Sequence, residues 1–156
     1  MYIIIFLLAI FADQVTKTLA KSYLMGQVQV KILKNWLHLT YLENKGAAWG
    51  MLQNAKYIFI IIAFAVCLAI LVFLLKNRNK IGISVKLPLV MIMAGAIGNV
   101  IDRFRFGYVV DFIFTPLGGI YDFPVFNFAD MYISFSAIFL IFYIFFIEGK
   151  NDKDRK

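Results

Sequence analysis

The sequence has few of the residues on which metal centres, disulfides and thiol chemistry depend. It contains one cysteine, Cys67, and one histidine, His38, so an internal disulfide and the two-histidine signature of a zinc protease are both excluded. Cysteine and histidine form no cluster with ligand spacing, and we therefore expect no metal and no other cofactor. Ser84, Ser134 and Ser136 have no histidine near them in the apolar segments, which argues against a Ser-His nucleophile.

Charged residues are also scarce, at 16% of the 156 residues, whereas hydrophobic residues make up 62%. A chain this apolar is not an ordinary water-soluble domain. The net charge of +7 lies mostly in connecting segments and in the tail, which indicates charge that flanks a membrane and not a patch that binds nucleic acid. The composition therefore predicts an integral membrane protein.

Four apolar segments are long enough to cross a membrane as helices, since a hydrocarbon core of about 30 Å requires about 20 helical residues. The predicted spans are approximately 1–20, 56–75, 85–104 and 126–147. A cleaved signal peptide is the alternative for the first segment, but no basic residue precedes its apolar run and no A-x-A-like cleavage site follows it. We expect an all-α membrane protein with four transmembrane helices, in which residues 1–156 form a single membrane domain.

Basic residues indicate the orientation of these spans, because cytoplasmic loops are enriched in lysine and arginine. The loop 76–84 and the tail 148–156 are both rich in basic residues, and with four spans they lie on the same side. This predicts that both termini are cytoplasmic. The first outer loop also contains lysines, so the charge bias is not uniform; these are Lys21, Lys31, Lys34 and Lys45.

The first outer segment has a second kind of pattern. Residues 27–32 alternate between polar and apolar side chains, and a similar period of two follows over 36–42. This period predicts strands. We expect a small antiparallel extracytoplasmic sheet over approximately 27–50, with a turn near 33–35 and a second outer loop over 105–125. An open sheet edge cannot lie in hydrocarbon, so the sheet should lie at the level of the lipid headgroups.

This topology brings the unusual polar clusters of the sequence to one membrane face. They are Asp13-Gln14 with Lys17, then 44–50, 95–103, 109–112 and 126–130. A charge within apolar sequence is costly and usually has a partner or a function. Asp13 and Lys17 are four residues apart and share a helical face, so we expect them to pair. For Asp102 we expect Arg103 as the partner.

Asp111 and Asp130 have no comparable basic neighbour in the sequence. Two carboxyl groups held close together at low dielectric cannot both ionise easily, so one becomes an acid and the other a base. Such a pair could polarise an amide carbonyl and activate water, as in a hydrolase. A small membrane transporter or lipid-binding protein with a proton relay would show the same pair, and spacing alone leaves both hypotheses open.

The five clusters, in this order and over nearly the whole chain, resemble the bacterial lipoprotein signal peptidases, also called signal peptidase II. One departure is that Ala94 precedes Gly95, where the family often has two glycines. The resemblance implies a membrane aspartic endopeptidase of the bacterial cytoplasmic membrane, with its active site at the extracytoplasmic face. It also implies that the enzyme cuts prolipoproteins just before a cysteine that carries a diacylglyceryl group and that the cyclic peptide globomycin inhibits it.

Residue matching to this family assigns Asp111 and Asp130 as the catalytic dyad. The positions that match substrate-binding or site-shaping residues are Asn44, Gly46, Asn99, Arg103 and Asn127, and those that match supporting residues are Asp13, Lys17 and Asp102. The expected partners are diacylglyceryl-modified prolipoproteins and membrane lipids, with no nucleic acid, and we expect the chain to act as a monomer.

Overall fold

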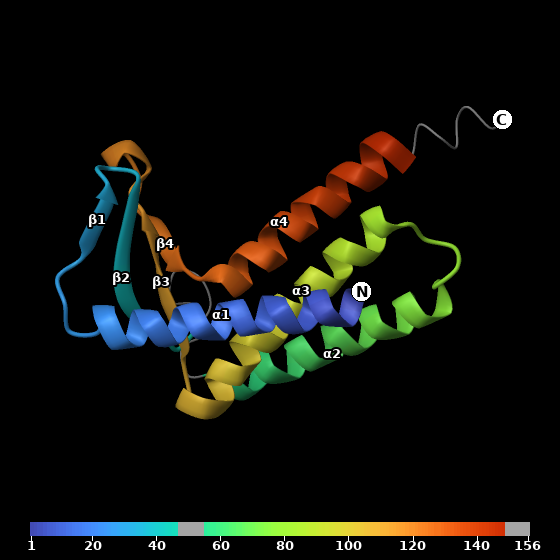
Figure 1. Ribbon diagram of the computed structural model, residues 1–156, viewed down its shortest axis with the longest axis horizontal. Coiled ribbons are helices and arrows are strands. Elements are labelled where there is room, and N and C mark those ends of the chain that lie inside the picture. Colours follow the sequence, from blue (N-terminus) through green and yellow to red (C-terminus); the bar gives the residue numbers. More distant parts are fainter. Residues whose placement is uncertain (47–54, 149–156) are drawn as a thin grey trace.

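The computed structural model describes residues 1–46 and 55–148, which form four long helices and one small sheet. The helices are α1 (Tyr2–Leu24), α2 (Lys56–Lys76), α3 (Ile83–Phe106) and α4 (Phe128–Phe142), and α4 continues into the π-helical η3 (Tyr143–Glu148). The strands are β1 (Val30–Leu33), β2 (Leu37–Asn44), β3 (Val109–Thr115) and β4 (Phe123–Phe126), with the short 3-10 helix η2 (Leu117–Gly119) before β4. All strands gather at one end of the helices, opposite the N-terminus and the α2–α3 turn (Figure 1).

The four helices, α4 together with η3, are long and apolar enough to cross a membrane. Their outward surfaces are apolar as well: Ile61, Leu68 and Phe145 are 66%, 62% and 73% exposed. Such surfaces would be costly in water but are suited to lipid. These features confirm the predicted fold class, a largely helical membrane protein with a small antiparallel sheet.

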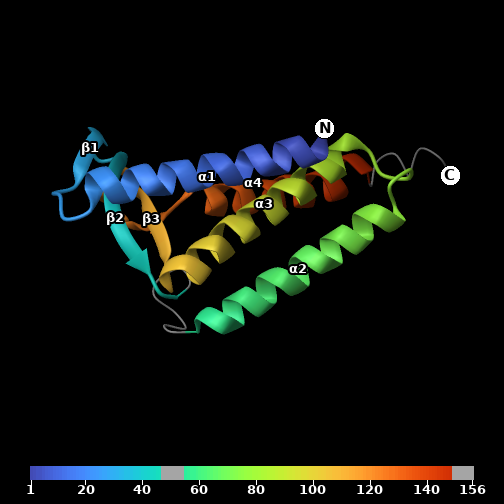
Figure 2. The same ribbon diagram turned by 60° about the horizontal axis from the view of Figure 1, so that its bottom comes forward.

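Helix α3 is the central element, because it packs against α1, α2 and α4. Helix α2 flanks α3 on the side away from α1 (Figure 2). Gly95 and Gly98 of α3 are both buried, whereas Ala96 between them is only half-buried. Small residues let helices approach closely in lipid, where dispersion contacts replace the hydrophobic effect between spans.

We expect Gly95→Ala to destabilise the protein, because a Cβ at this position would overlap the backbone oxygen of Ala129 and lie 2.9 Å from Cγ1 of Ile133. Overpacking of this kind costs about 1–3 kcal/mol. The measurement is thermal unfolding in detergent, with Gly82→Ala as the control, since a Cβ at Gly82 meets nothing within 4 Å. Equal melting temperatures for the two variants would contradict the close α3–α4 contact.

The sheet has the strand order β1-β2-β3-β4 and is antiparallel throughout. Strand β3, one of the two inner strands, packs against the end of α1 through a buried cluster of Ala20, Val110, Phe112 and Ile113. Asp111 lies between the apolar residues of this cluster in β3 and is opposite Leu42 in β2. The apolar cluster therefore fixes the backbone that holds the Asp111 carboxyl.

The prediction of a sheet confined to 27–50, with a loop over 105–125, was wrong in part. Two of the four strands, β3 and β4, lie within or at the edge of that loop segment. Residues 109–113 are all buried, so the strand shows no alternation of polar and apolar residues that a period-two search could find. The turn of the first hairpin does lie near 33–35, where Asn35 has a φ of 62°. The predicted sheet residues 47–50 lie outside the described residues.

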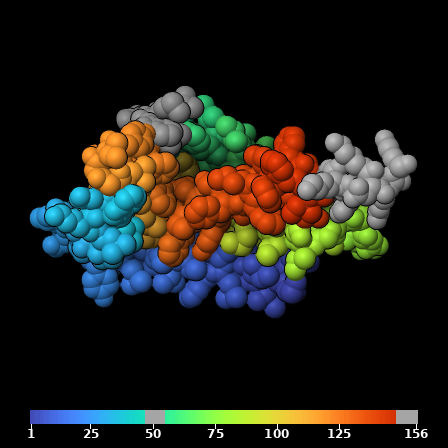
Figure 3. All heavy atoms as spheres, turned by 90° about the horizontal axis from the view of Figure 1, so that it is seen from above, coloured from blue at the N-terminus to red at the C-terminus, as the bar shows by residue number. Residues whose placement is uncertain are grey.

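Seen from above, the residues of the sheet form one end of the molecule and α4 runs along the adjacent face towards the other end (Figure 3). This arrangement places the first turn of α4 beside the sheet. The N-terminal residues of α4 and the strand β3 can therefore contribute to one site.

Candidate active site

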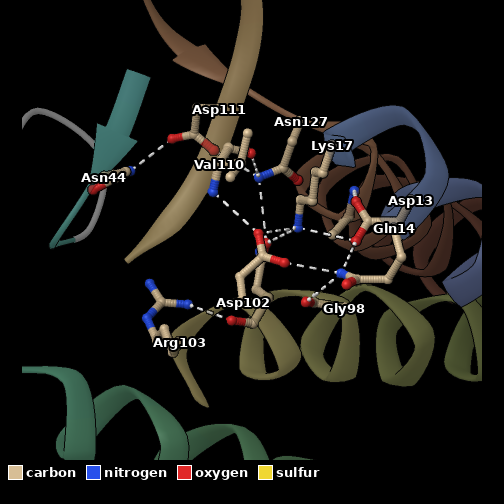
Figure 4. Close-up of polar contacts among 12 residues, drawn as sticks. Asp13, Gln14, Lys17, Asn44, Gly98, Asp102, Arg103, Val110, Asp111 and Asn127 are labelled. Carbon is tan, nitrogen blue, oxygen red and sulfur yellow. Dashed lines mark hydrogen bonds and ion pairs between the residues drawn. The ribbon is translucent and has the colours of Figure 1, made fainter. Parts of the chain in front are cut away.

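A buried lysine connects α1 to α3 at the sheet end of the helices. Lys17 is 3% exposed, and its Nζ lies 2.9 Å from Oδ2 of Asp13 and 3.2 Å from Oδ2 of Asp102 (Figure 4). The expected pair of Asp13 and Lys17 is confirmed, but the expected pair of Asp102 and Arg103 is wrong. Adjacent residues of a helix point about 100° apart, so Asp102 faces α1 while Arg103 faces away from it.

The two aspartates of this network also bind backbone amides of other elements. Oδ1 of Asp13 accepts a hydrogen bond from the backbone N–H of Ala129 at 3.0 Å, and Oδ2 of Asp102 accepts one from Val110 at 3.0 Å. Gln14 donates to both carboxylates, at 3.2 and 2.9 Å. The network thus joins α1, α3, β3 and α4. Gln14 belongs to a sequence motif but was not assigned as a site residue; its bridging position is a long-range property that the sequence does not reveal.

Asn127 connects the two aspartates singled out from the sequence. It caps α4 reciprocally with Asp130: the Asn127 Oδ1 accepts from the Asp130 N–H at 3.0 Å, and the Asp130 Oδ2 accepts from the Asn127 N–H at 3.2 Å. The side-chain amide of Asn127 donates to Oδ1 of Asp111 at 2.6 Å. One fully buried asparagine therefore contacts both carboxyl groups.

Two more asparagines hold these carboxyl groups from the sides. Asn44 donates to Oδ2 of Asp111 at 2.8 Å, and Asn99 donates to Oδ1 of Asp130 at 2.8 Å. The Asn99 oxygen in turn accepts from Nζ of Lys17 at 2.9 Å. Because that oxygen faces the lysine, the NH₂ group of Asn99 must face Asp130. The buried Lys17 thus sets the orientation of the Asn99 side-chain amide that binds the Asp130 carboxylate.

The Asp111 carboxyl lies in an environment that opposes its ionisation. Burial is the largest cause, followed by the negative charge of Asp130, and together they raise the pKa of Asp111 from 3.8 to about 7. The hydrogen bonds from Asn44 and Asn127 act in the opposite direction and do not offset the burial. The geometry thus supplies one carboxyl group whose pKa lies close to neutral pH.

Arg103 lies beside the aspartates and joins them to neighbouring segments. Its guanidinium donates to the backbone oxygens of Gly46 at 3.1 Å and Asn99 at 3.4 Å. The same group lies 4.7 Å from the ring centroid of Phe59 in α2. The arginine therefore fixes the position of the Gly46 backbone and contributes a positive charge near both carboxyl groups.

A cavity of about 660 Å³ opens where these residues meet. Its polar lining includes Asn44, Gly46, Asn99, Arg103, Asp111 and Asp130. The remaining lining is mostly apolar and includes Phe59, Phe126 and Met131. An apolar cavity with a few convergent polar groups is typical of a ligand site. The apolar members were not predicted, because in a membrane span they cannot be told from residues that face lipid.

The structure brings together the site residues predicted from the sequence. Six line the cavity, Asn127 lies directly behind the two carboxyl groups, and the network of Asp13, Lys17 and Asp102 lies behind Asn99. Within 1–46 and 55–148, no group of three or more histidine, cysteine or acidic residues is placed to hold a metal ion. The arrangement offers two carboxyl groups, of which Asp111 has a raised pKa, beside a space that could hold water and an extended chain.

The chain matches the family model described as Signal peptidase (SPase) II over residues 5–146. A lipoprotein signal peptidase of Clostridioides difficile (strain 630) is 40% identical over 97% of this chain and 99% of that protein. Another, from Caldanaerobacter subterraneus subsp. tengcongensis, is 44% identical over 96% of this chain and 99% of its own length. A bacterial membrane enzyme solved by the in meso method at 2.3 Å resolution superposes with a TM-score of 0.83 at 31% identity, covering 99% of this chain and 91% of that one.

Proposed function

Because the chain belongs to the signal peptidase II family of membrane peptidases, we propose that it is an aspartic endopeptidase that removes the signal peptide from prolipoproteins. Family membership confirms the resemblance found in the sequence. In this proposal the cut falls just before a cysteine that carries a diacylglyceryl group. The observation that supports it most is that Asp111 and Asp130 contact one asparagine and line one cavity.

In the proposed reaction, Asp111 is the acid and Asp130 is the base. The raised pKa of Asp111 favours its protonated form. The Asp130 carboxylate accepts hydrogen bonds from the side-chain amide of Asn99 and from the backbone N–H of Asn127, at the positive end of α4. Asp130 takes a proton from water as the water oxygen attacks the scissile carbonyl carbon, and Asp111 gives its proton to the carbonyl oxygen. A tetrahedral gem-diol results, without a covalent enzyme intermediate.

Breakdown of this intermediate completes the cycle. The C–N bond breaks, the leaving nitrogen takes the proton held by Asp130, and one hydroxyl of the gem-diol returns its proton to Asp111. The products are a signal peptide with a new carboxyl group and a lipid-modified cysteine with a free amino group. We assign the positive charge of Arg103 the role of stabilising negative charge as it develops on the carbonyl oxygen.

The position of the cavity supports a lipid-modified substrate. The cavity lies where the apolar helices reach the sheet, so the acyl chains of a bound precursor could remain in the bilayer while its peptide enters. We propose that this end faces the extracytoplasmic side, that both termini are cytoplasmic and that the chain acts as a monomer. A proton relay in a transporter, the alternative raised by the sequence, is not proposed, because the family is one of peptidases.

The direct test is incubation of the purified protein in detergent with a diacylglyceryl-modified precursor peptide, followed by mass measurement of the products. We expect two products whose combined mass exceeds that of the precursor by one water, and we expect globomycin to prevent their formation. The same peptide without its lipid is the control and should be cut poorly. An intact lipidated precursor after prolonged incubation would refute the proposed function.

The pKa of Asp111 predicts the alkaline side of the pH profile. Because the proposed acid must be protonated, kcat/KM should fall about tenfold per pH unit above pH 7. The amide of Asn44 stabilises the ionised form of Asp111, so Asn44→Ala should raise this pKa and move the alkaline limb to higher pH. The measurement is kcat/KM between about pH 5 and pH 9 for both proteins. A limb that stays at the same pH would exclude Asp111 as the titrating acid.

A further inference from the structure

A second cavity, of about 200 Å³, lies between the C-terminal parts of α1 and α3 and is also lined by Val110 of β3. Thr18, Lys21 and Ser22 of α1 and Arg105 and Phe106 of α3 form its outer part. The buried network forms part of its inner lining, through Lys17 and Asp102. The proposed peptidase reaction uses none of the five outer residues.

Two cations converge on one aromatic ring at this cavity. Nζ of Lys21 lies 4.2 Å from the ring centroid of Phe106, and the guanidinium of Arg105 lies 5.0 Å from the same centroid. Lys21 donates a hydrogen bond to the hydroxyl of Tyr108 at 3.3 Å. Over the described part of the chain, neither cation forms a salt bridge with a carboxylate. Asp102 is not available as their counterion, because Lys17 and Gln14 already bind it.

Unpaired cations brought together in this way repel each other, and an anion between them would relieve the repulsion. Basic residues in the last turn of a helix do interact favourably with that helix's own C-terminus. That interaction would act on each helix separately and does not require the two cations to share a ring and a cavity. The hydroxyl of Ser22 adds an exposed hydrogen-bond donor at the same cavity.

The surroundings of the cavity indicate which anion it would take. It lies at the end of two membrane-spanning helices, where lipid headgroups begin. Exposed apolar side chains of α1 lie on the same helical face as Thr18 and Ser22, because they precede them at three- and four-residue spacing; Phe11 is 66% and Val15 37% exposed. A ligand with a negative head and apolar chains would satisfy both the cations and these surfaces.

We propose that the cavity between Lys21 and Arg105 binds the phosphate group of an anionic phospholipid, with the acyl chains lying along α1 and α3. The site is separate from the cavity of the two aspartates, and its occupancy does not depend on the proposed peptidase reaction. A bound lipid at this place would also cover the outer side of the Lys17 network and shield it from water.

The test is native mass spectrometry of the full chain in detergent, titrated with phosphatidylglycerol and, separately, with zwitterionic phosphatidylcholine. The test variant is K21Q/R105Q, and the matched control is K31Q/K34Q, which loses the same charge from exposed positions at the β1 hairpin. We expect about tenfold weaker binding of phosphatidylglycerol by the test variant, unchanged binding by the control and little effect on phosphatidylcholine. The swapped variant K21R/R105K keeps both charges and should retain binding.

One further measurement distinguishes the sources of the anion. A large excess of inorganic phosphate should displace phosphatidylglycerol only weakly if the acyl chains contribute, whereas complete displacement would assign the site to free phosphate instead of lipid. Circular dichroism of each variant confirms folding, which we expect because neither cation belongs to the buried network. Equal loss of phosphatidylglycerol binding in the test and control variants would show an effect of general surface charge and would overturn the proposal. Unchanged binding by both variants would overturn it as well.

Discussion

Asp111→Asn and Asp130→Asn are each expected to abolish cleavage of a lipid-modified precursor. Asparagine has nearly the shape of aspartate but can neither give up nor take a proton at the reacting carbonyl. Loss of a general acid or base costs about 10²–10⁴-fold in rate, and a dyad that acts as a unit loses most of its effect when either member is removed. We therefore expect kcat/KM to fall by about 10³-fold or more in each variant, measured by mass spectrometry of the cleavage products.

The matched control is Asp122→Asn, because Asp122 is an exposed aspartate in the segment before β4 and does not line the cavity. This variant should retain nearly full activity. Folding of the dyad variants can be checked by thermal unfolding in detergent, since the Asp111→Asn side chain would still present an oxygen to the Asn127 amide. Substantial turnover by either dyad variant would rule out the proposed acid and base roles.

The pairing of the two aspartates could be anticipated from the sequence, but the reason for it could not. Asp111 and Asp130 were recognisable because each carries a charge within apolar sequence and lacks a basic neighbour. Their meeting depends on Asn127, whose backbone starts α4 and whose side chain reaches β3. The spacing of Asn127 and Asp130 is that of a helix cap, whereas the contact with Asp111 is set by how the sheet packs on the helices.

Helix spans could be predicted closely and the sheet only in part, for a physical reason. A span of about 20 apolar residues is a local signal, because the bilayer and not the rest of the chain defines its length. Strand β3 is recognisable only once its partners are known, since it is buried throughout 109–113 and does not alternate. The error over Asp102 has the same origin: Arg103 is its neighbour in sequence, but Lys17 is its neighbour in space.

Lys17→Met is expected to destabilise the protein more than any other substitution of a lysine in the described chain. Methionine fills a similar volume but leaves the carboxylates of Asp13 and Asp102 buried, at 0% and 1% exposure, without their shared cation. Removal of one partner from a buried ion pair costs about 3–5 kcal/mol, because the remaining charge is uncompensated. The measurement is the free energy of unfolding in detergent, with Lys31→Met at an exposed position of β1 as the control.

The same substitution separates a structural role of Lys17 from a role in positioning Asn99. If the lysine only neutralises Asp13 and Asp102, the triple variant K17M/D13N/D102N should recover both stability and activity. If it also fixes the amide of Asn99 against Asp130, stability should recover while kcat stays low, because the Asn99 oxygen has lost the donor that holds it. We expect the second result, since Asn127 offers Asn99 only a longer hydrogen bond of 3.3 Å in place of the 2.9 Å one. Full recovery of kcat would limit Lys17 to charge neutralisation.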